Sequence, residues 1–257
     1  VSDIDDAVYV AAGDYHACAI LEDATAKCWG SGSNGKLGNG STSNSLEPDV
    51  VTDLEDVVDI SAGYAHTCAV QEDGDVYCWG YNHYNQVLPD GNNNYEEPVK
   101  VSDVENAMNV VTGDYHSCAL IDDGTIQCWG DEDDGQLGYG SSADTDLVVT
   151  VEDIDNATQI SAGQNHTCVL LDDDTVKCWG KNSNGQLGDN SNDDANSPVS
   201  VIDLEDVVQI EAGGDFTCAL TSSDEVYCWG DVNSHNLGFD TNQSYIDEPS
   251  SAVDFDW

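Results

Sequence analysis

The chain has 257 residues, of which 51 are Asp or Glu and 5 are Lys or Arg, giving a formal net charge of −46. Proteins bind nucleic acids mainly through basic side chains that displace counterions, so this charge argues against a nucleic-acid partner. No run of about 18 apolar residues is present to span a membrane. With 39% hydrophobic residues the chain can still bury a core, which distinguishes it from a disordered acidic tail.

The acidic residues are spread along the whole chain instead of being gathered at one place. Dense carboxylates hold water, and strong salt screens their mutual repulsion. We therefore interpret the acidity as an adaptation to high salt. A cation store would require carboxylates clustered around a pocket.

The chain repeats with a period of 50 residues. Each copy contains two cysteines ten residues apart, and the second is followed by Trp-Gly. The first cysteines are Cys18, Cys68, Cys118, Cys168 and Cys218, and the second are Cys28, Cys78, Cys128, Cys178 and Cys228. Histidines keep the same step at His16, His66, His116 and His166, until Phe216 takes the fifth position. Five copies of one structural unit are indicated.

Within a copy the pattern favours strands. In chain order, the second copy predicts strands at Val57–Ser61, His66–Gln71 and Asp75–Trp79, all short, rich in β-branched or aromatic residues and bounded by Gly, Asp or Asn. A further strand follows Pro98, as one follows Pro198 in a later copy. Four strands per 50 residues are typical of a propeller blade, so the fold class is all-β: a β-propeller of five four-stranded blades.

The register of the central hairpin follows from its turn. A three-residue loop at 72–74 places Gly74 where such loops need a left-handed backbone conformation. Cys68 then opposes Cys78, and Thr67 opposes Trp79 on the other face. Both faces carry apolar residues, as expected for sheets that stack on their neighbours.

Cysteines directly opposed on antiparallel strands are close enough to bridge. We predict one disulfide in each blade, with the pairs Cys18–Cys28, Cys68–Cys78, Cys118–Cys128, Cys168–Cys178 and Cys218–Cys228. A zinc site is the alternative, but these cysteines lack the close spacing of structural zinc ligands. Paired cysteines indicate an extracellular or cell-surface location.

The blade boundaries follow from the repeat. We predict a single propeller domain over 1–257, with blades at about 1–47, 48–97, 98–147, 148–197 and 198–248, and a closing strand at 249–257. The segment from Pro249 resembles the one from Pro198, so it can supply a strand missing at the start of the first blade. The same strand could instead complete a neighbouring molecule.

A family resemblance emerges from the longest shared motif. The segment Ala162–Leu170, with Val176–Asn182 and Gly185–Gly188, resembles the repeat of the regulator of chromosome condensation family. The resemblance covers essentially all five copies and implies a β-propeller, most often of seven blades. Members include a nuclear guanine-nucleotide exchange factor, which uses a projecting hairpin for which this period leaves no room. The resemblance to secreted, non-enzymatic binding members implies a protein of that kind.

No set of catalytic-type residues stands apart from the periodic positions of the repeat. One histidine per blade beside a disulfide is interpreted as a packed or hydrogen-bonded structural position. No Ser, His and Asp set departs from the fixed spacing, so we predict that the protein is not an enzyme and has no catalytic residues and no cofactor.

Binding candidates lie in the variable loops. Tyr81, His83, Tyr84 and Tyr95 form an amphipathic set of the kind that anchors partners or sugars, although a solvated loop would have the same composition. Asp90, Asn92, Asn94 and Glu96 alternate like a calcium-binding loop but lack its properly placed Gly and Glu, so they are weak calcium candidates. The glycosylation sequon occurs at Asn39, Asn242, Asn156 and Asn165.

The sequence therefore predicts an extracellular or cell-surface propeller that binds a protein, a glycan or copies of itself. The alternative is a structural subunit of an external layer or filament, a homo-oligomer joined by strand exchange through its C-terminal tail.

Overall fold

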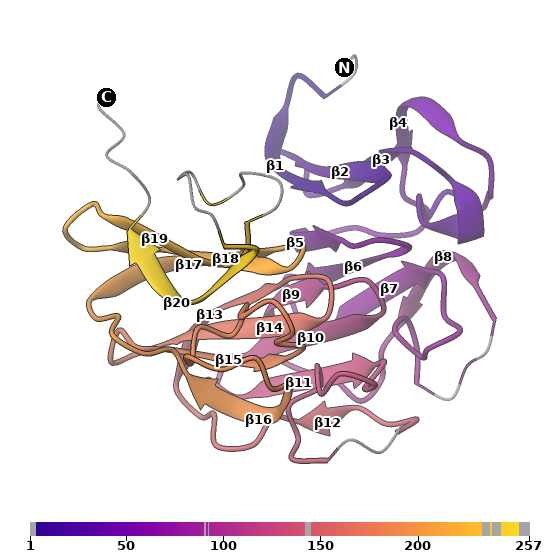
Figure 1. Ribbon diagram of the computed structural model, residues 1–257. Coiled ribbons are helices and arrows are strands. Elements are labelled where there is room, and N and C mark those ends of the chain that lie inside the picture. Colours follow the sequence, from indigo (N-terminus) through magenta and orange to yellow (C-terminus); the bar gives the residue numbers. More distant parts are fainter. Residues whose placement is uncertain are drawn as a thin grey trace. The chain divides into compact units, whose positions relative to one another are not determined.

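The computed structural model describes residues 4–89, 91, 93–141, 145–232, 237 and 243–251. Its strands form five four-stranded sheets in which sequence neighbours pair, as predicted for propeller blades (Figure 1). The first sheet contains β1 (Ala7–Ala12), β2 (His16–Leu21), β3 (Ala26–Gly30) and β4 (Ser45–Val50), with a short 3₁₀ turn, η1 (Ser33–Gly35), between β3 and β4. The second contains β5 (Val57–Ala62), β6 (His66–Gln71), β7 (Val76–Gly80) and β8 (Tyr95–Lys100). The third contains β9 (Ala107–Thr112), β10 (His116–Ile121), β11 (Ile126–Gly130) and β12 (Val149–Thr150). The fourth contains β13 (Ala157–Ala162), β14 (His166–Leu171), β15 (Val176–Gly180) and β16 (Ala195–Ser200). The fifth contains β17 (Val207–Gly213), β18 (Phe216–Thr221), β19 (Val226–Asp231) and β20 (Tyr245–Ser251).

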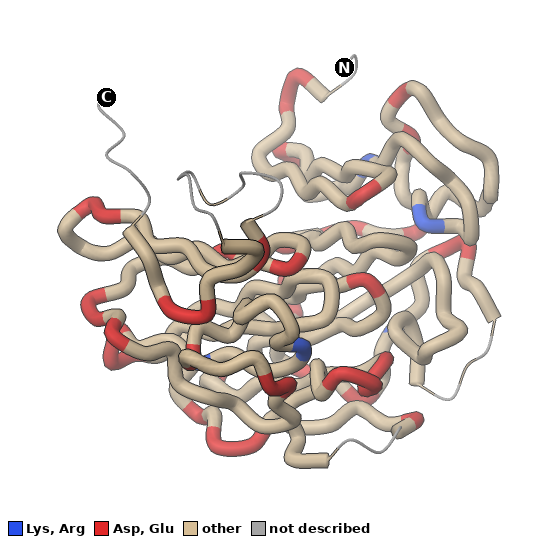
Figure 2. The backbone as a smooth tube through the Cα atoms, in the orientation of Figure 1, with Lys and Arg blue, Asp and Glu red and all other residues tan. Residues whose placement is uncertain are grey.

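The contacts of the chain divide it into two compact units. The first unit contains Val1–Asp122, Ile126–Asp131 and Asp144–Val149, and the second contains Asp123–Thr125, Glu132–Ala143 and Thr150–Trp257. In both units acidic residues recur at the turns, whereas lysines are few (Figure 2).

The predicted hairpin register is confirmed in every sheet. Cys68 opposes Cys78 and Thr67 opposes Trp79 between β6 and β7. The turn that sets this register uses the left-handed conformation at Gly74, with φ 83°. The equivalent turn residues are Ala24, Gly124, Asp174 and Asp224, all with positive φ. The turn therefore keeps its conformation although its residue changes.

All five predicted disulfides are present, and the Cα atoms of each pair lie 4.1 Å apart. Because strand side chains alternate between faces, Cys78 and Trp79 project to opposite sides of the sheet. The disulfide of one sheet accordingly packs in the same core cluster as the tryptophan of the next sheet: Cys68 and Cys78 lie with Trp129. The same combination joins Cys18 and Cys28 to Trp79, and Cys168 and Cys178 to Trp229. Both faces of the central strands are thus buried.

The sheet boundaries differ from the predicted blades. The strand containing Pro198 and Val199 ends the fourth sheet, where Val199 opposes Cys178, and does not begin the next one. Likewise β20 pairs with β19, so residues 249–251 of the predicted closing strand complete the fifth sheet. The physical reason is that an antiparallel meander pairs each strand with the one preceding it in the chain. Residues 252–257 lie outside the described part.

Candidate functional site

The periodic histidines lie in contacts between neighbouring sheets. The hydroxyl of Ser117 donates to the carbonyl oxygen of Gln86 at 2.8 Å, and the indole N–H of Trp129 donates to the same oxygen at 2.9 Å. Since the hydroxyl hydrogen points to that carbonyl, the hydroxyl oxygen accepts a hydrogen bond from Nε2 of His66 at 2.8 Å. The same arrangement recurs twice. His16 pairs with the Thr67 hydroxyl, which shares the Lys36 carbonyl oxygen with Trp79. His166 pairs with the Thr217 hydroxyl, which shares the Gln186 carbonyl oxygen with Trp229.

Burial favours the neutral form of His16, His66 and His116 at neutral pH. Burial lowers the pKa of His16 and His66 to about 3 and that of His116 to about 4. An enclosed imidazole whose pKa lies far below neutrality is poorly suited to general acid–base catalysis at neutral pH. His16, His66 and His166 are buried and hydrogen-bonded, as predicted, and His116 is buried.

The variable loops of each blade meet at one edge of its sheet. The backbone N–H of Tyr81, just after Trp-Gly, donates to the carbonyl oxygen of Ala65, in the loop before β6, at 3.0 Å. Gly80 permits this approach: it has φ 108°, and a Cβ there would lie 2.6 Å from the Ala65 oxygen. Equivalent bonds join Ser31 to Tyr15, Asp131 to Tyr115, Lys181 to Asn165 and Asp231 to Asp215. Two loops that vary between repeats are therefore held side by side.

In the first unit these loops form a continuous aromatic group. We call it the tyrosine surface; it consists of Tyr15, Tyr64, Tyr81, His83, Tyr84 and Tyr115. Tyr64 lies between Tyr15 and Tyr115, with ring centroids 5.4 and 5.8 Å away. Tyr115 in turn lies 4.8 Å from Tyr84 and 6.0 Å from Tyr81, which stacks on His83 at 4.8 Å. Tyr15 and Tyr84 are 57% and 42% exposed. The group thus offers ring area to a partner.

Three of the four predicted binding residues belong to this surface. Tyr81, His83 and Tyr84 are brought together, whereas Tyr95 lies on β8 and packs against the apolar core. Tyr15, Tyr64 and Tyr115 were missed, because they stand just before the periodic histidines and look like part of the repeat. A signal was available, because the two residues before His16, His66, His116, His166 and Phe216 change from repeat to repeat: they are Asp-Tyr, Tyr-Ala, Asp-Tyr, Gln-Asn and Gly-Asp.

The calcium candidates are only partly described. Asp90 and Asn92 lie outside the described residues. Asn94 uses its side-chain oxygen to accept the backbone N–H of Asn82 at 3.3 Å and donates its amide to Asn34 at 3.1 Å, while Glu96 lies exposed on β8. Across the described ranges, no three His, Cys, Asp or Glu side chains gather as a metal site would require.

The sequon asparagines are placed unequally. Asn39 donates its amide to Asp49 at 2.8 Å, and Asn156 donates to Asp172. Asn165 lies half-buried in the loop before β14, and Asn242 is outside the described residues. Glycosylation at these positions stays a prediction.

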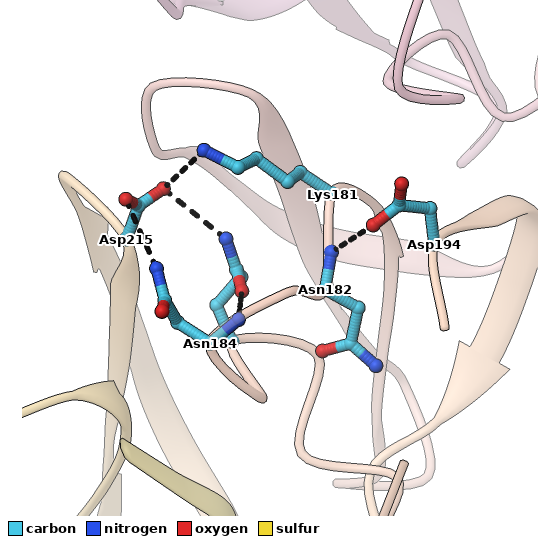
Figure 3. A network of polar contacts seen from close by, with 6 residues as sticks. Lys181, Asn182, Asn184, Asp194 and Asp215 are labelled. Carbon is cyan, nitrogen blue, oxygen red and sulfur yellow. Dashed lines mark hydrogen bonds and ion pairs between the residues drawn. The ribbon is translucent and has the colours of Figure 1, made fainter. Parts of the chain in front are cut away.

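In the second unit the same loops carry a polar network. Oδ1 of Asp215 accepts from Lys181 Nζ at 3.4 Å and from Gln186 Nε2 at 3.2 Å, and Oδ2 accepts from Asn184 at 3.2 Å (Figure 3). Asp194 separately accepts the backbone N–H of Asn182 at 2.7 Å (Figure 3). These carboxylates are engaged by the protein's own donors, which suits them to fixing loop conformation.

The second unit also contains a hollow of about 580 Å³. Its lining includes Asp203, Glu205, Asp206, Glu225 and Tyr227, and it has neither histidine nor cysteine. Within this lining the Ser223 hydroxyl donates to a carboxylate oxygen of Glu225 at 3.1 Å and lies 2.9 Å from the Thr221 hydroxyl. In the described part of the chain, moreover, no helix is long and apolar enough to cross a membrane.

Comparison with known proteins identifies the family. A family model described as RCC1-like domain matches residues 1–255. Human WBSCR16 has a similar structure, with a TM-score of 0.84, 22% sequence identity, and 97% of this chain matched to 67% of that one. Yeast RCC1 (Prp20), solved bound to Kap60, gives a TM-score of 0.81 and 21% identity over 95% of this chain and 63% of that one. The CRINKLY ectodomain of the Arabidopsis thaliana receptor kinase ACR4 gives 0.53 and 19%, over 87% and 63%.

The chain thus spans about two thirds of the length of these structures, and at such identities the likeness concerns the fold. No curated protein matches the sequence. With the repeat, the five blades and the family match in agreement, this chain belongs to the RCC1-like domain family.

Proposed function

We propose that this protein is a non-enzymatic, extracellular binding scaffold, adapted to high salt, that contacts a partner through the tyrosine surface. The observation that carries the proposal is the gathering of five tyrosines and one histidine from three blades into one group of contacting rings. Aromatic side chains that combine a large apolar area with a polar tip dominate the energetics of protein interfaces. Rigid blades below them keep the loops in place, which lowers the ordering cost of binding.

The family supports a binding role. Yeast RCC1 (Prp20) has been solved bound to Kap60, and Prp20p from Saccharomyces cerevisiae has binding properties toward Gsp1p and histones. We propose that this chain likewise contacts a partner through its loop region. The contacting residues proposed here are those of its own tyrosine surface.

The scaffold role is tested by comparing partner capture by two variants in native salt. Tyr84→Ala with Tyr15→Ala removes two exposed rings of the tyrosine surface, whereas Tyr9→Ala removes a tyrosine that is 48% exposed on β1. We expect proteins cross-linked by the wild type to persist with the β1 variant and to be lost with the surface variant. Equal capture by all three chains would refute this placement of the partner contact.

Location and salt adaptation have their own tests. Five disulfides favour an oxidising compartment. Chain isolated from its source without reductant should weigh ten hydrogens less than the reduced form, since all 10 cysteines are paired. Ten free thiols would exclude the proposed compartment.

The net charge of −46 predicts a melting temperature that rises with KCl up to molar concentration, and a falling melting temperature would contradict salt adaptation.

A further inference from the structure

The tyrosine surface has acidic neighbours. Asp14 and Asp114 precede Tyr15 and Tyr115 in the chain, and Asp14 is exposed. Their charges act on the rings: the pKa of Tyr64 is raised first by Tyr15 and by burial, then by Asp114 and, more weakly, by Asp14. Burial raises the pKa of Tyr115, with further contributions from Tyr64 and Asp114. The phenol groups of Tyr64 and Tyr115 thus lie within the field of these carboxylates.

One lysine of the protein itself, Lys36, already contacts the tyrosine surface. Nζ of Lys36 lies 5.4 Å from the centre of the Tyr15 ring and donates to the carbonyl oxygen of Tyr64 at 3.3 Å. Such a distance is within the range of a cation–π interaction. Lys36 is only 3% exposed, so its ammonium group is covered while the outer rings of Tyr15 and Tyr84 remain open.

Charge complementarity selects the class of partner. A neutral ligand such as a glycan would gain ring stacking and hydroxyl hydrogen bonds to Asp14 or Asp114, but no charge–charge attraction. An acidic ligand would be repelled both by these residues and by the net charge of −46. A guanidinium or ammonium group gains from the ring quadrupole and from the carboxylates together.

We propose that the tyrosine surface binds an arginine- or lysine-bearing segment of a protein partner, with its cationic side chains stacked on the exposed rings of Tyr84 and Tyr15 in the field of Asp14 and Asp114. This inference rests on the proposed function and adds the chemistry of the ligand. Arginine is the better match, because its planar group stacks on an aromatic ring while its N–H groups donate to carboxylates.

The test separates ring recognition from general attraction to an acidic protein. Binding of a capped pentaarginine peptide is measured by calorimetry in about 1 M KCl, where the Debye length of about 3 Å screens long-range attraction. The comparison peptide contains five citrullines, which have nearly the same shape without the charge. We expect the citrulline peptide to bind at least tenfold more weakly. Equal affinities would overturn the cationic ligand and leave the partner contact of the proposed function intact.

Matched variants localise the binding. Tyr84→Phe keeps an aromatic face and should retain affinity, whereas Tyr84→Leu keeps apolar bulk and should lose about fivefold to tenfold. Asp114→Asn should weaken binding, while Asp103→Asn makes the same charge change at an exposed position in the loop between β8 and β9 and should not. Equal affinities across these variants would overturn the assignment to this surface. If the protein binds maltohexaose in a way that depends on Tyr84 and does not bind pentaarginine, the ligand is a glycan and the cationic proposal is wrong.

Discussion

His66 Nε2 lies 2.8 Å from the hydroxyl of Ser117, which belongs to the next sheet of the same unit. The bond joins two blades through a histidine that is fully buried. Protonation of this ring would place a charge in an apolar contact, so the junction couples the stability of the blades to pH.

Stability should therefore fall on mild acidification. The pKa of His66 drops from its ordinary 6.5 to about 3 on folding, so between these values the unfolded chain binds more protons. The histidine contribution is complete above pH 6.5 and is lost as the pH falls toward 3. For each such histidine, the free energy of unfolding falls by about 1.4 kcal/mol for every unit by which the pH is lowered within this window.

Urea unfolding between about pH 5 and pH 7.5, in about 1 M KCl to screen carboxylate repulsion, measures this slope. His66→Gln should flatten the curve by the share of one histidine. His83→Gln, at an exposed ring, is the matched control and should leave the slope unchanged. A wild-type curve that is level below pH 6.5 would contradict the assignment of neutral buried histidines.

The hydroxyl at this junction should be required. Ser117→Ala leaves the His66 N–H without its acceptor and removes one donor from the Gln86 carbonyl, which should cost about 1–3 kcal/mol of unfolding free energy. Ser117→Thr keeps the hydroxyl, as Thr67 does at the equivalent position, and should stay within about 1 kcal/mol of wild type. Denaturant titration distinguishes the two; equal losses would show that volume matters at this position and the hydroxyl does not.

The hairpin turns offer a stabilising change. Ala24 has φ 62°, a conformation in which a side chain is strained, so Ala24→Gly should raise the melting temperature, with a gain of about 0.5–1 kcal/mol. The reverse change, Gly74→Ala, should destabilise, because a Cβ there would lie 2.7 Å from the Asn106 Cα. Calorimetric melting of both variants is the measurement, and a lower melting point for Ala24→Gly would refute the strain.

Each disulfide should contribute measurably. The Cys68–Cys78 bond closes a loop with a sequence separation of 10, for which chain entropy predicts about 3 kcal/mol. The variant Cys68→Ala with Cys78→Ala should lose about that amount in urea unfolding. The two single variants serve as controls and should lose nearly as much as the double variant, since either one breaks the bond. If the losses of the two single variants instead add up to the loss of the double variant, the effect comes from side-chain packing and not from the bond.

The strands, the hairpin register and the cysteine pairs could be predicted because they depend on local, periodic information. Alternation of side chains and a three-residue turn are enough to place Cys68 against Cys78 and Thr67 against Trp79. The role of the histidines was inferred from their periodicity, but their partners were not, since Ser117 is 51 residues from His66.

Only the tertiary structure decided which sheet receives the strand with Val199, and which tyrosines share a surface. Tyr15, Tyr64 and Tyr115 are separated by about one repeat each in the chain, and their rings touch only because neighbouring blades bury a disulfide against a tryptophan between them. Such contacts depend on how sheets stack, a property of the packed core that no single fifty-residue copy contains.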